Sequence, residues 1–215
     1  MKTVKQDWLI WIMLVIPFVF VAFVWNRLPE QVATHFDMQG NPNDYSSKPF
    51  AALFIPLLNA VLYFFLLLAP KIDPRRKNYA LFGDKYRIIR LVIHAFMTFT
   101  FLVSTFYAMG YHFNMGMMVM YGILFLFLIF GNYMGNVRPN FFVGIRSPWT
   151  LSSEQVWMKT HRMAGKLWVF STLLMMVLLP FLPSFDIFFL VYVAAITLVP
   201  FIYSYIEYKK EEAHK

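Results

Sequence analysis

The sequence predicts an all-α integral membrane protein with six transmembrane helices. Of its 215 residues, 60% are hydrophobic and 20% aromatic, the mean hydropathy is +0.57, and six apolar runs each have the length of a membrane span. Ordinary soluble domains are only about 45–50% apolar, so lipid is the expected solvent for much of this chain. Unpaired backbone groups are not tolerated in lipid and no alternating strand pattern is present, so the spans are predicted to be helices.

The first apolar run, residues 8–25, follows a basic start and resembles a signal peptide in position. It is longer than a usual signal core and lacks a small-residue cleavage site before Asn26, so we expect a retained span. At 1.5 Å per residue, each later run is also about long enough for a hydrocarbon core of roughly 30 Å. These runs are residues 50–69, 88–109, 115–133, 167–183 and 186–206. Four prolines should kink or end helices: Pro17, Pro56, Pro180 and Pro200.

No Ser/Gly/Pro-rich linker divides the chain, and we expect one compact membrane unit. Within it, residues 1–110 form an N-terminal membrane region with an outer loop at 26–49, and residues 111–215 form a second region with a polar segment at 132–167. The chain contains no cysteine, which excludes disulfides and thiolate chemistry.

Lysine and arginine are divided very unequally between the two sets of loops. Only Arg27 and Lys48 lie on one side, and the turns at 111–114 and 183–186 carry none. The other 17 of the 19 basic residues lie in the two termini and in the loops after the second and fourth spans. The positive-inside rule therefore predicts that both termini and the 138–166 segment are cytoplasmic. The net charge of +8 then reflects topology and attraction to anionic lipids, and direct binding of nucleic acid is not predicted.

The segment RPNFFVGIRSPWTLSSEQVWMKTHRMAGK, residues 138–166, is the most polar part of the second region. Its prolines and Gly144 predict tight corners. A cytoplasmic amphipathic helix is then predicted between the fourth and fifth spans, starting with a capping box at Ser152 and Gln155. Trp157 and His161 share a stripe of this helix with Gly165. One interpretation is an interfacial helix with snorkelling cations. The alternative is a surface for a protein partner or a phospholipid headgroup.

Catalysis by this segment is an alternative that we do not favour. His161, Glu154 and Arg146 have the chemistry of a base, an orienting carboxylate and an anion clamp. The chain contains no HExxH, GxSxG or phosphate-binding loop motif. No catalytic residue and no cofactor are therefore predicted.

The outer loop and the spans contain a few further polar residues. His35, Asp37 and Asp44, with Glu30 and His112, have the chemistry of a metal site, but a set of solvated side chains around a turn is favoured, and no metal is predicted. Within the spans, Asn59 and His94 fit either helix contacts or a proton relay.

Two stretches resemble known protein families. NYMGNVRPNFFVGIRSPWTLSSEQVWMKTHRMAGKL, residues 132–167, resembles the signature of the SdpI family, with Ser147 where threonine is more usual. LPEQVATHFDMQGNPNDYSSKPF, residues 28–50, is similar to the short conserved module of unknown function that often precedes the SdpI region.

The resemblance implies a multi-pass protein of the bacterial cytoplasmic membrane that confers resistance to a sporulation-delaying-type peptide toxin. In the named system of the family, the immunity protein also holds a transcriptional repressor at the membrane. The alternatives are a transporter that handles lipids or peptides and an enzyme at the inner leaflet. Matching by motif carries functional importance to Asn132, Asn136, Arg138, Pro139, Asn140, Gly144, Ile145, Arg146, Ser147, Pro148, Trp149, Thr150, Trp157, Thr160, His161, Arg162 and Gly165.

The two faces of the membrane are expected to divide the function. His35, Asp37 and Asp44 are candidates for sensing on the outer face. On the inner face, Arg146 and Trp149 are expected to contact a ligand or partner, and His161 and Arg162 to donate hydrogen bonds to an acidic partner.

Overall fold

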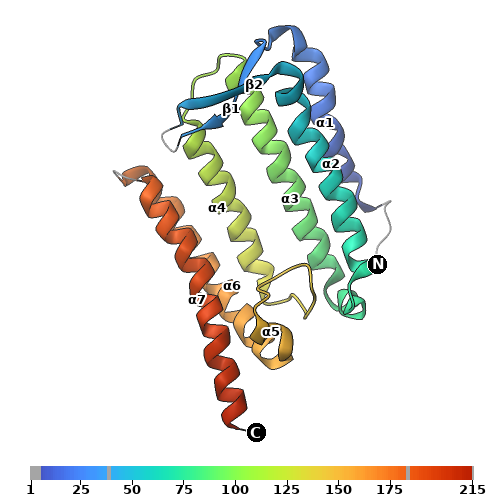
Figure 1. The fold of residues 1–215 in the computed structure, drawn as a ribbon, viewed down its shortest axis with the longest axis vertical. Coiled ribbons are helices and arrows are strands. Elements are labelled where there is room, and N and C mark those ends of the chain that lie inside the picture. The colour runs from blue at the N-terminus through green and yellow to red at the C-terminus, as the bar shows by residue number, and fades with distance from the viewer. Residues whose placement is uncertain (1–5, 38–39, 183–184, 215) are drawn as a thin grey trace. The chain divides into compact units, whose positions relative to one another are not determined.

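The computed structural model describes residues 6–37, 40–182 and 185–214 (Figure 1). Three of the basic residues used above to orient the chain, Lys2, Lys5 and Lys215, lie outside these ranges, as do the first two residues of the 183–186 turn.

Six long helices account for most of the described chain. Each is long and apolar enough to cross a membrane, which confirms the predicted number of spans. Their bounds are α1 Trp8–Val24, α2 Lys48–Ile72, α3 Tyr79–Ala108, α4 Met115–Met134, α6 Glu154–Leu178 and α7 Phe185–Ala213. The shorter elements are η2 Trp25–Arg27, β1 Gln31–Phe36, β2 Pro42–Ser47, η3 Arg76–Asn78, α5 Pro148–Ser152 and η4 Leu179–Phe181.

Contacts divide the described residues into two compact units. The N-terminal unit consists of residues up to 66 together with 90–123, and the C-terminal unit consists of residues 67–89 together with those from 124 onward. Each is described separately below.

A hydrophobic cluster packs the N-terminal unit around the end of α1. Val21 and Val24 of α1 meet Leu28, Ala52 of α2 and Phe101 of α3, all at most 7% exposed. Burial of these side chains away from the lipid-exposed surface fixes the three helices against one another.

The 28–50 segment, expected as a loop, contains an antiparallel hairpin of β1 and β2 (Figure 1). Its register runs from Gln31 opposite Ser47 to Phe36 opposite Pro42, with irregularities on either side of His35. These irregularities interrupt the alternation of buried and exposed residues, and the strand PNDYSS is poor in typical strand formers. The sequence pattern therefore did not predict the hairpin.

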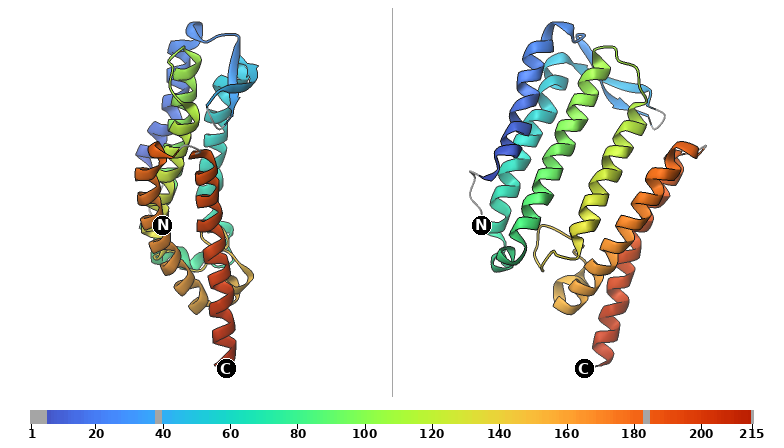
Figure 2. Two further views of the ribbon diagram at one scale, coloured as in Figure 1. Left: turned by 90° about the vertical axis from the view of Figure 1, so that its left-hand side faces the viewer. Right: turned by 180° about the vertical axis from the view of Figure 1, so that it is seen from behind.

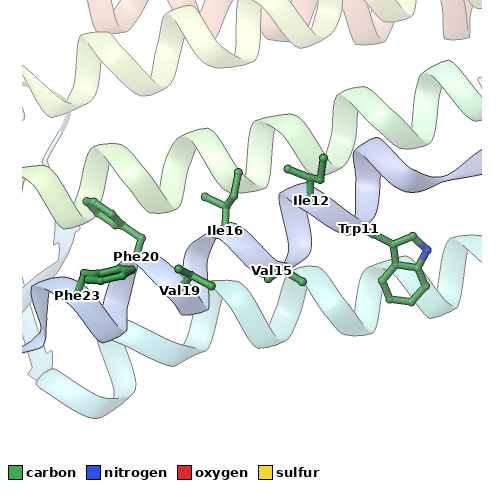
Figure 3. A pocket seen from close by; sticks show the side chains of 7 residues that line it. All are labelled: Trp11, Ile12, Val15, Ile16, Val19, Phe20 and Phe23. Carbon is green, nitrogen blue, oxygen red and sulfur yellow. The ribbon is translucent and has the colours of Figure 1, made fainter.

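The outward face of α1 is entirely apolar (Figure 3). A shallow hollow of about 580 Å³ on it is lined by Trp11, Ile12, Val15, Ile16, Val19, Phe20 and Phe23. None of these side chains brings a charge or a hydroxyl to the hollow, and exposed apolar surface is expected wherever a helix faces lipid. We assign this face to lipid contact.

In the C-terminal unit, the predicted amphipathic helix is not a separate element. The helix α6 continues without interruption from Glu154 to Leu178, so the amphipathic stretch and the fifth span are one helix, which packs along α7 (Figure 2). The predicted cap was also wrong by one residue. Ser153 caps α6 by accepting the Val156 N–H, whereas Ser152 belongs to α5.

Glycines allow α4 and α6 to approach closely. A Cβ atom on Gly131 of α4 would lie 2.8 Å from the Trp168 Cβ, and one on Gly165 of α6 would lie 2.8 Å from the Gly131 carbonyl oxygen. Helices in lipid commonly associate through such small residues. Gly165 of the signature therefore has a packing role.

Candidate functional site

The candidate site is the signature loop, residues 135–147, together with α5 and the first turns of α6. It belongs to the C-terminal unit, in which the α2–α3 connector lies at the same end (Figure 1). The hydrogen bonds described next hold these segments together.

Asp73, directly after α2, joins the connector to the signature loop. Its side chain is 1% exposed, and its carboxylate accepts hydrogen bonds from the Arg75 N–H at 2.7 Å, the Phe141 N–H at 2.9 Å and the Tyr79 hydroxyl at 3.0 Å. A buried carboxylate is tolerated when it is paired or fully hydrogen-bonded, and three donors meet this requirement. Asp73 is thus a structural anchor for Phe141.

Asn140 organises the signature loop from inside. Its side chain is fully buried, and its carbonyl oxygen accepts the N–H groups of Phe142 and Val143 at 2.9 and 2.7 Å. Its amide group donates to the carbonyl oxygens of Arg138 and Val143. An asparagine can bond in this way to the backbone on both sides of a turn, and aspartate lacks the donor. The loop conformation therefore requires this amide.

Two further side chains of the connector reach the signature segment. The Arg75 guanidinium donates to the Leu151 carbonyl at 2.6 Å and lies 5.4 Å from the centre of the Phe141 ring. The Asn78 amide donates to the Pro139 carbonyl at 2.7 Å. These side-chain donors satisfy one carbonyl of the signature loop and one carbonyl near the end of α5.

His161 supports the loop from α6, and its orientation differs from the expected one. The ring is fully buried and stacks on Trp157, with centroids 4.1 Å apart. Its Nε2 accepts the Ile145 N–H at 3.0 Å, and its Nδ1 lies 2.8 Å from the Trp157 carbonyl, to which it donates. A partner cannot reach this ring, so the expectation that His161 projects toward an acidic partner was wrong.

Gly144 is required where the loop passes over this ring. Its φ of +111° is disfavoured for other residues, and a Cβ atom there would lie 2.4 Å from the His161 Nε2. The neighbouring Trp157 indole is fully buried as well and donates to the Val137 carbonyl at 2.8 Å. The loop therefore lies directly on a stacked pair of rings.

The corner at Ser147 starts α5 and attaches it to α7. Ser147 and Thr150 form a reciprocal capping box with Pro148 in the first turn. The Ser147 hydroxyl also lies 2.8 Å from the Ser204 hydroxyl of α7, and both groups are buried. These bonds need only a hydroxyl group, so Ser147 can make them as the more usual threonine would.

Trp149 packs inward against aromatic residues of α7. Its ring centroid lies 5.1 Å from that of Phe201 and 5.0 Å from that of Tyr205. The indole is only partly exposed, so its main contacts are within the protein.

Ionic contacts attach the end of α7 to α6. The Glu207 carboxylate, 6% exposed, receives Lys159 and Lys210 at 2.8 Å each, and Ser153 donates to Glu211. Hydrogen bonds of this kind to a charged acceptor are stronger than neutral ones. They hold the last turns of α7 beside the cap of α6.

Of the polar residues that the motif match singles out, four are exposed: Asn132, Asn136, Arg146 and Arg162. Arg146 donates to the Phe141 carbonyl, and Arg162 lies beside Gly135, about 3.7 Å from a Cβ position there. Thr160 and Pro139 are buried, Pro148 is exposed, and Arg138 and Ile145 are half-buried. Most of the signature is thus internal structure, and only a minority is available to a partner.

The geometry does not assemble the catalytic set considered above. Both ring nitrogens of His161 are engaged by backbone groups, and Arg146 is bonded to a loop carbonyl. A general base needs a free nitrogen within reach of its substrate.

The residues expected on the outer face belong to the hairpin of the N-terminal unit. The Asp37 carboxylate accepts the Asn41 backbone N–H at 2.7 Å and the Asn41 side-chain N–H at 3.1 Å, and His35 lies 3.0 Å from the Asn43 side-chain oxygen. Asp44 accepts the N–H of the following Tyr45. No three of the described His, Asp and Glu residues are placed to hold a metal ion.

A second buried polar cluster lies among the helices of the N-terminal unit. Arg90 donates to Asp7 at 2.8 Å and lies over the Tyr63 ring, and His94 is 2.7 Å from the Asn59 side-chain oxygen. The His94 Nε2, Asn59 Nδ2 and Arg90 Nε atoms have no partner in the described part of the chain. The bond between His94 of α3 and Asn59 of α2 is a contact between helices, which is one of the two interpretations given above.

Sequence reasoning did not identify Asp73, Arg75 or Asn78 as part of the site. The available signal was DPRRKN between two spans, with an aspartate and an asparagine at the ends of a short basic connector. Short polar side chains at such positions often bond to nearby backbone.

Two protein-family models match parts of this chain. Residues 136–204, which include the signature loop, α5, α6 and most of α7, match the model of the SdpI/YfhL protein family. Residues 12–60, which include most of α1, the hairpin and part of α2, match a domain of unknown function, DUF1648.

A curated relative covers nearly the whole chain. The chain is 28% identical over 203 residues to the immunity protein SdpI of Bacillus subtilis strain 168, an alignment that covers 93% of this chain and 94% of that protein. No solved structure matches the chain. The relative and the six apolar helices together indicate a multi-pass membrane protein.

Proposed function

We propose that this chain is an immunity protein of the bacterial cytoplasmic membrane that protects its cell from a sporulation-delaying-type peptide toxin. The observation that carries the proposal is the full-length similarity to a protein named for immunity, combined with a family region that includes the folded signature. We further propose that both termini and the signature are cytoplasmic, on the basis of the unequal distribution of lysine and arginine.

The proposed output is the retention of a transcriptional repressor at the membrane. Its surface would consist of the exposed residues Asn136, Arg146 and Arg162, which lie on the signature loop and the first turns of α6, whereas Asn140 and His161 are buried and bond within the protein. Guanidinium groups at such a surface suit an acidic partner through charge-assisted hydrogen bonds.

The proposed input is on the opposite side, at the hairpin. His35 and Asp44 are exposed there, whereas Asp37 is half-buried and bonded to Asn41. Coupling between two faces requires that each ligand distinguishes the same two states of the protein. Changes at His35 should therefore alter the response to toxin, and changes at Arg146 and Arg162 should alter recruitment.

The test is to express the chain in a toxin-sensitive host and to follow a fluorescent repressor candidate with and without toxin. Arg146→Ala with Arg162→Ala should abolish recruitment at a normal membrane level, and Lys166→Ala, which removes another exposed cation of α6, should retain it. Recruitment that survives the double substitution would contradict the assigned surface.

A further inference from the structure

A cleft in the C-terminal unit lies beside the α2–α3 connector. The cleft has a volume of about 490 Å³ and is lined by Pro74, Arg75, Arg76, Lys77, Asn78, Pro139 and Glu154. This volume lies within the range of about 300–1,000 Å³ that small-molecule sites occupy. None of the exposed signature residues discussed above lines it, so it is a separate feature.

The charge of the lining selects an anion. Three cations, Arg75, Arg76 and Lys77, meet a single carboxylate, Glu154. Arg76 and Lys77 are exposed, whereas Arg75 is held by the Leu151 carbonyl and the Phe141 ring. A fixed guanidinium flanked by two adjustable cations matches the several acceptor oxygens of a phosphate group.

The wall of the cleft is rigid, which lowers the entropic cost of binding. Asp73 fixes the backbone of the connector through its three hydrogen bonds, and the Asn78 amide ties it to the Pro139 carbonyl at 2.7 Å. Two of the lining residues are prolines, whose backbone angle φ is fixed. A ligand therefore meets cations that the fold has already gathered.

The position of the cleft indicates whether the phosphate belongs to a lipid headgroup or is dissolved in water. The connector is the point at which α2 ends and α3 begins, and the flanking side chains Ile72 and Leu81 are 64% and 70% exposed. Exposed apolar side chains at the end of a spanning helix face acyl chains, so adjacent cations lie at the level of the lipid headgroups. This arrangement favours a lipid over a phosphate dissolved in water.

Glu154 refines the class of headgroup. A carboxylate repels a bare phosphate but accepts hydrogen bonds from a hydroxyl or ammonium group. Because three cations outnumber this one carboxylate, a headgroup with a net negative charge fits better than a zwitterionic one with an ammonium group. The structure assigns the cleft to a phospholipid headgroup that carries one phosphate together with hydroxyl donors, as phosphatidylglycerol does. This assignment does not depend on the immunity function.

The experiment uses the purified full-length protein in nanodiscs of phosphatidylcholine with or without one-fifth phosphatidylglycerol. Retained lipid is counted by native mass spectrometry. The variant Arg76→Gln with Lys77→Gln removes two cations of the cleft, and Lys166→Gln with Lys209→Gln removes two exposed cations elsewhere in the same unit. Because all four side chains are exposed, each variant should fold, which a thermal unfolding temperature near that of the parent would verify.

The cleft variant should lose phosphatidylglycerol affinity by about tenfold or more, and the control variant by less than about threefold. Glu154→Gln should bind phosphatidic acid more tightly and reduce the preference for phosphatidylglycerol. Inorganic phosphate and glycerol phosphate should not displace the lipid at equal concentration. Equal losses in the two double variants, or no preference for the anionic lipid, would overturn the site. Displacement by the soluble phosphates would show that the cleft binds free phosphate and would contradict the assignment to a lipid headgroup.

Discussion

The substitution Gly144→Ala tests how the signature is built. An added Cβ would lie 2.4 Å from the His161 Nε2 and 3.2 Å from the Trp157 ring, and the backbone would be left at a φ of +111°. A residue other than glycine in such a conformation costs about 1–3 kcal/mol. The imidazole must also move, although it is fully buried and makes hydrogen bonds of 3.0 and 2.8 Å.

Weakening those two hydrogen bonds adds about 1–3 kcal/mol, so the total loss of stability is about 2–6 kcal/mol. In a protein of this size, each kcal/mol shifts the unfolding temperature by roughly 2–4 °C. The matched control is Gly135→Ala, at which an added Cβ would meet Arg162 atoms at ordinary distances of 3.7 and 3.8 Å. It should change stability by less than about 1 kcal/mol.

The assay is thermal unfolding of the purified protein in detergent, followed by tryptophan fluorescence. Gly144→Ala should unfold about 4–24 °C below the parent protein, and Gly135→Ala less than about 4 °C below it. In a double-mutant cycle, Gly144→Ala should cost less in a His161→Ala background, because the clashing ring is absent. Equal unfolding temperatures for the two glycine variants, or strict additivity in the cycle, would refute the proposed packing of the loop on His161.

Three further predictions follow from other contacts. Asp73→Ala should destabilise the protein by about 3–5 kcal/mol, since it removes the acceptor of three hydrogen bonds, and limited proteolysis should then cut the signature loop; a resistant loop would argue against the anchor. The Asp7 and Arg90 side chains are 5% and 7% exposed, and removing either one should lower the free energy of unfolding by about 3–5 kcal/mol. Removing both should cost less than the sum of the two single losses, which unfolding of the three variants would measure. Because the chain lacks cysteine, single cysteines at Ser152 and Asn43 can be labelled with an impermeant maleimide on intact cells; only the second should react, and the reverse would overturn the orientation.

The spans and the corners of the site were predictable because they depend on local sequence. Apolar run length identified all six helices, and Gly144 was expected at a tight corner. The shared stripe of Trp157, His161 and Gly165 also follows from helical spacing, and all three residues are buried.

Other features depend on contacts between residues far apart in the chain. The bond from Phe141 to Asp73 joins positions 68 residues apart, and no local pattern specifies it. The inward orientation of His161 depends on the loop that covers it, since polarity alone suggested an exposed side chain. The shift of the cap from Ser152 to Ser153 arose because α5 uses the first serine.

The most direct test of the central claim is survival under toxin. A toxin-sensitive Bacillus strain without its own immunity protein would express this chain, and its colony count would be measured against increasing concentrations of the sporulation-delaying peptide. The account predicts that the chain raises the lethal concentration by at least about tenfold over an empty vector, and that Gly144→Ala loses this protection while Gly135→Ala keeps it. A chain that reaches the membrane in normal amount yet leaves the lethal concentration unchanged would contradict the immunity function.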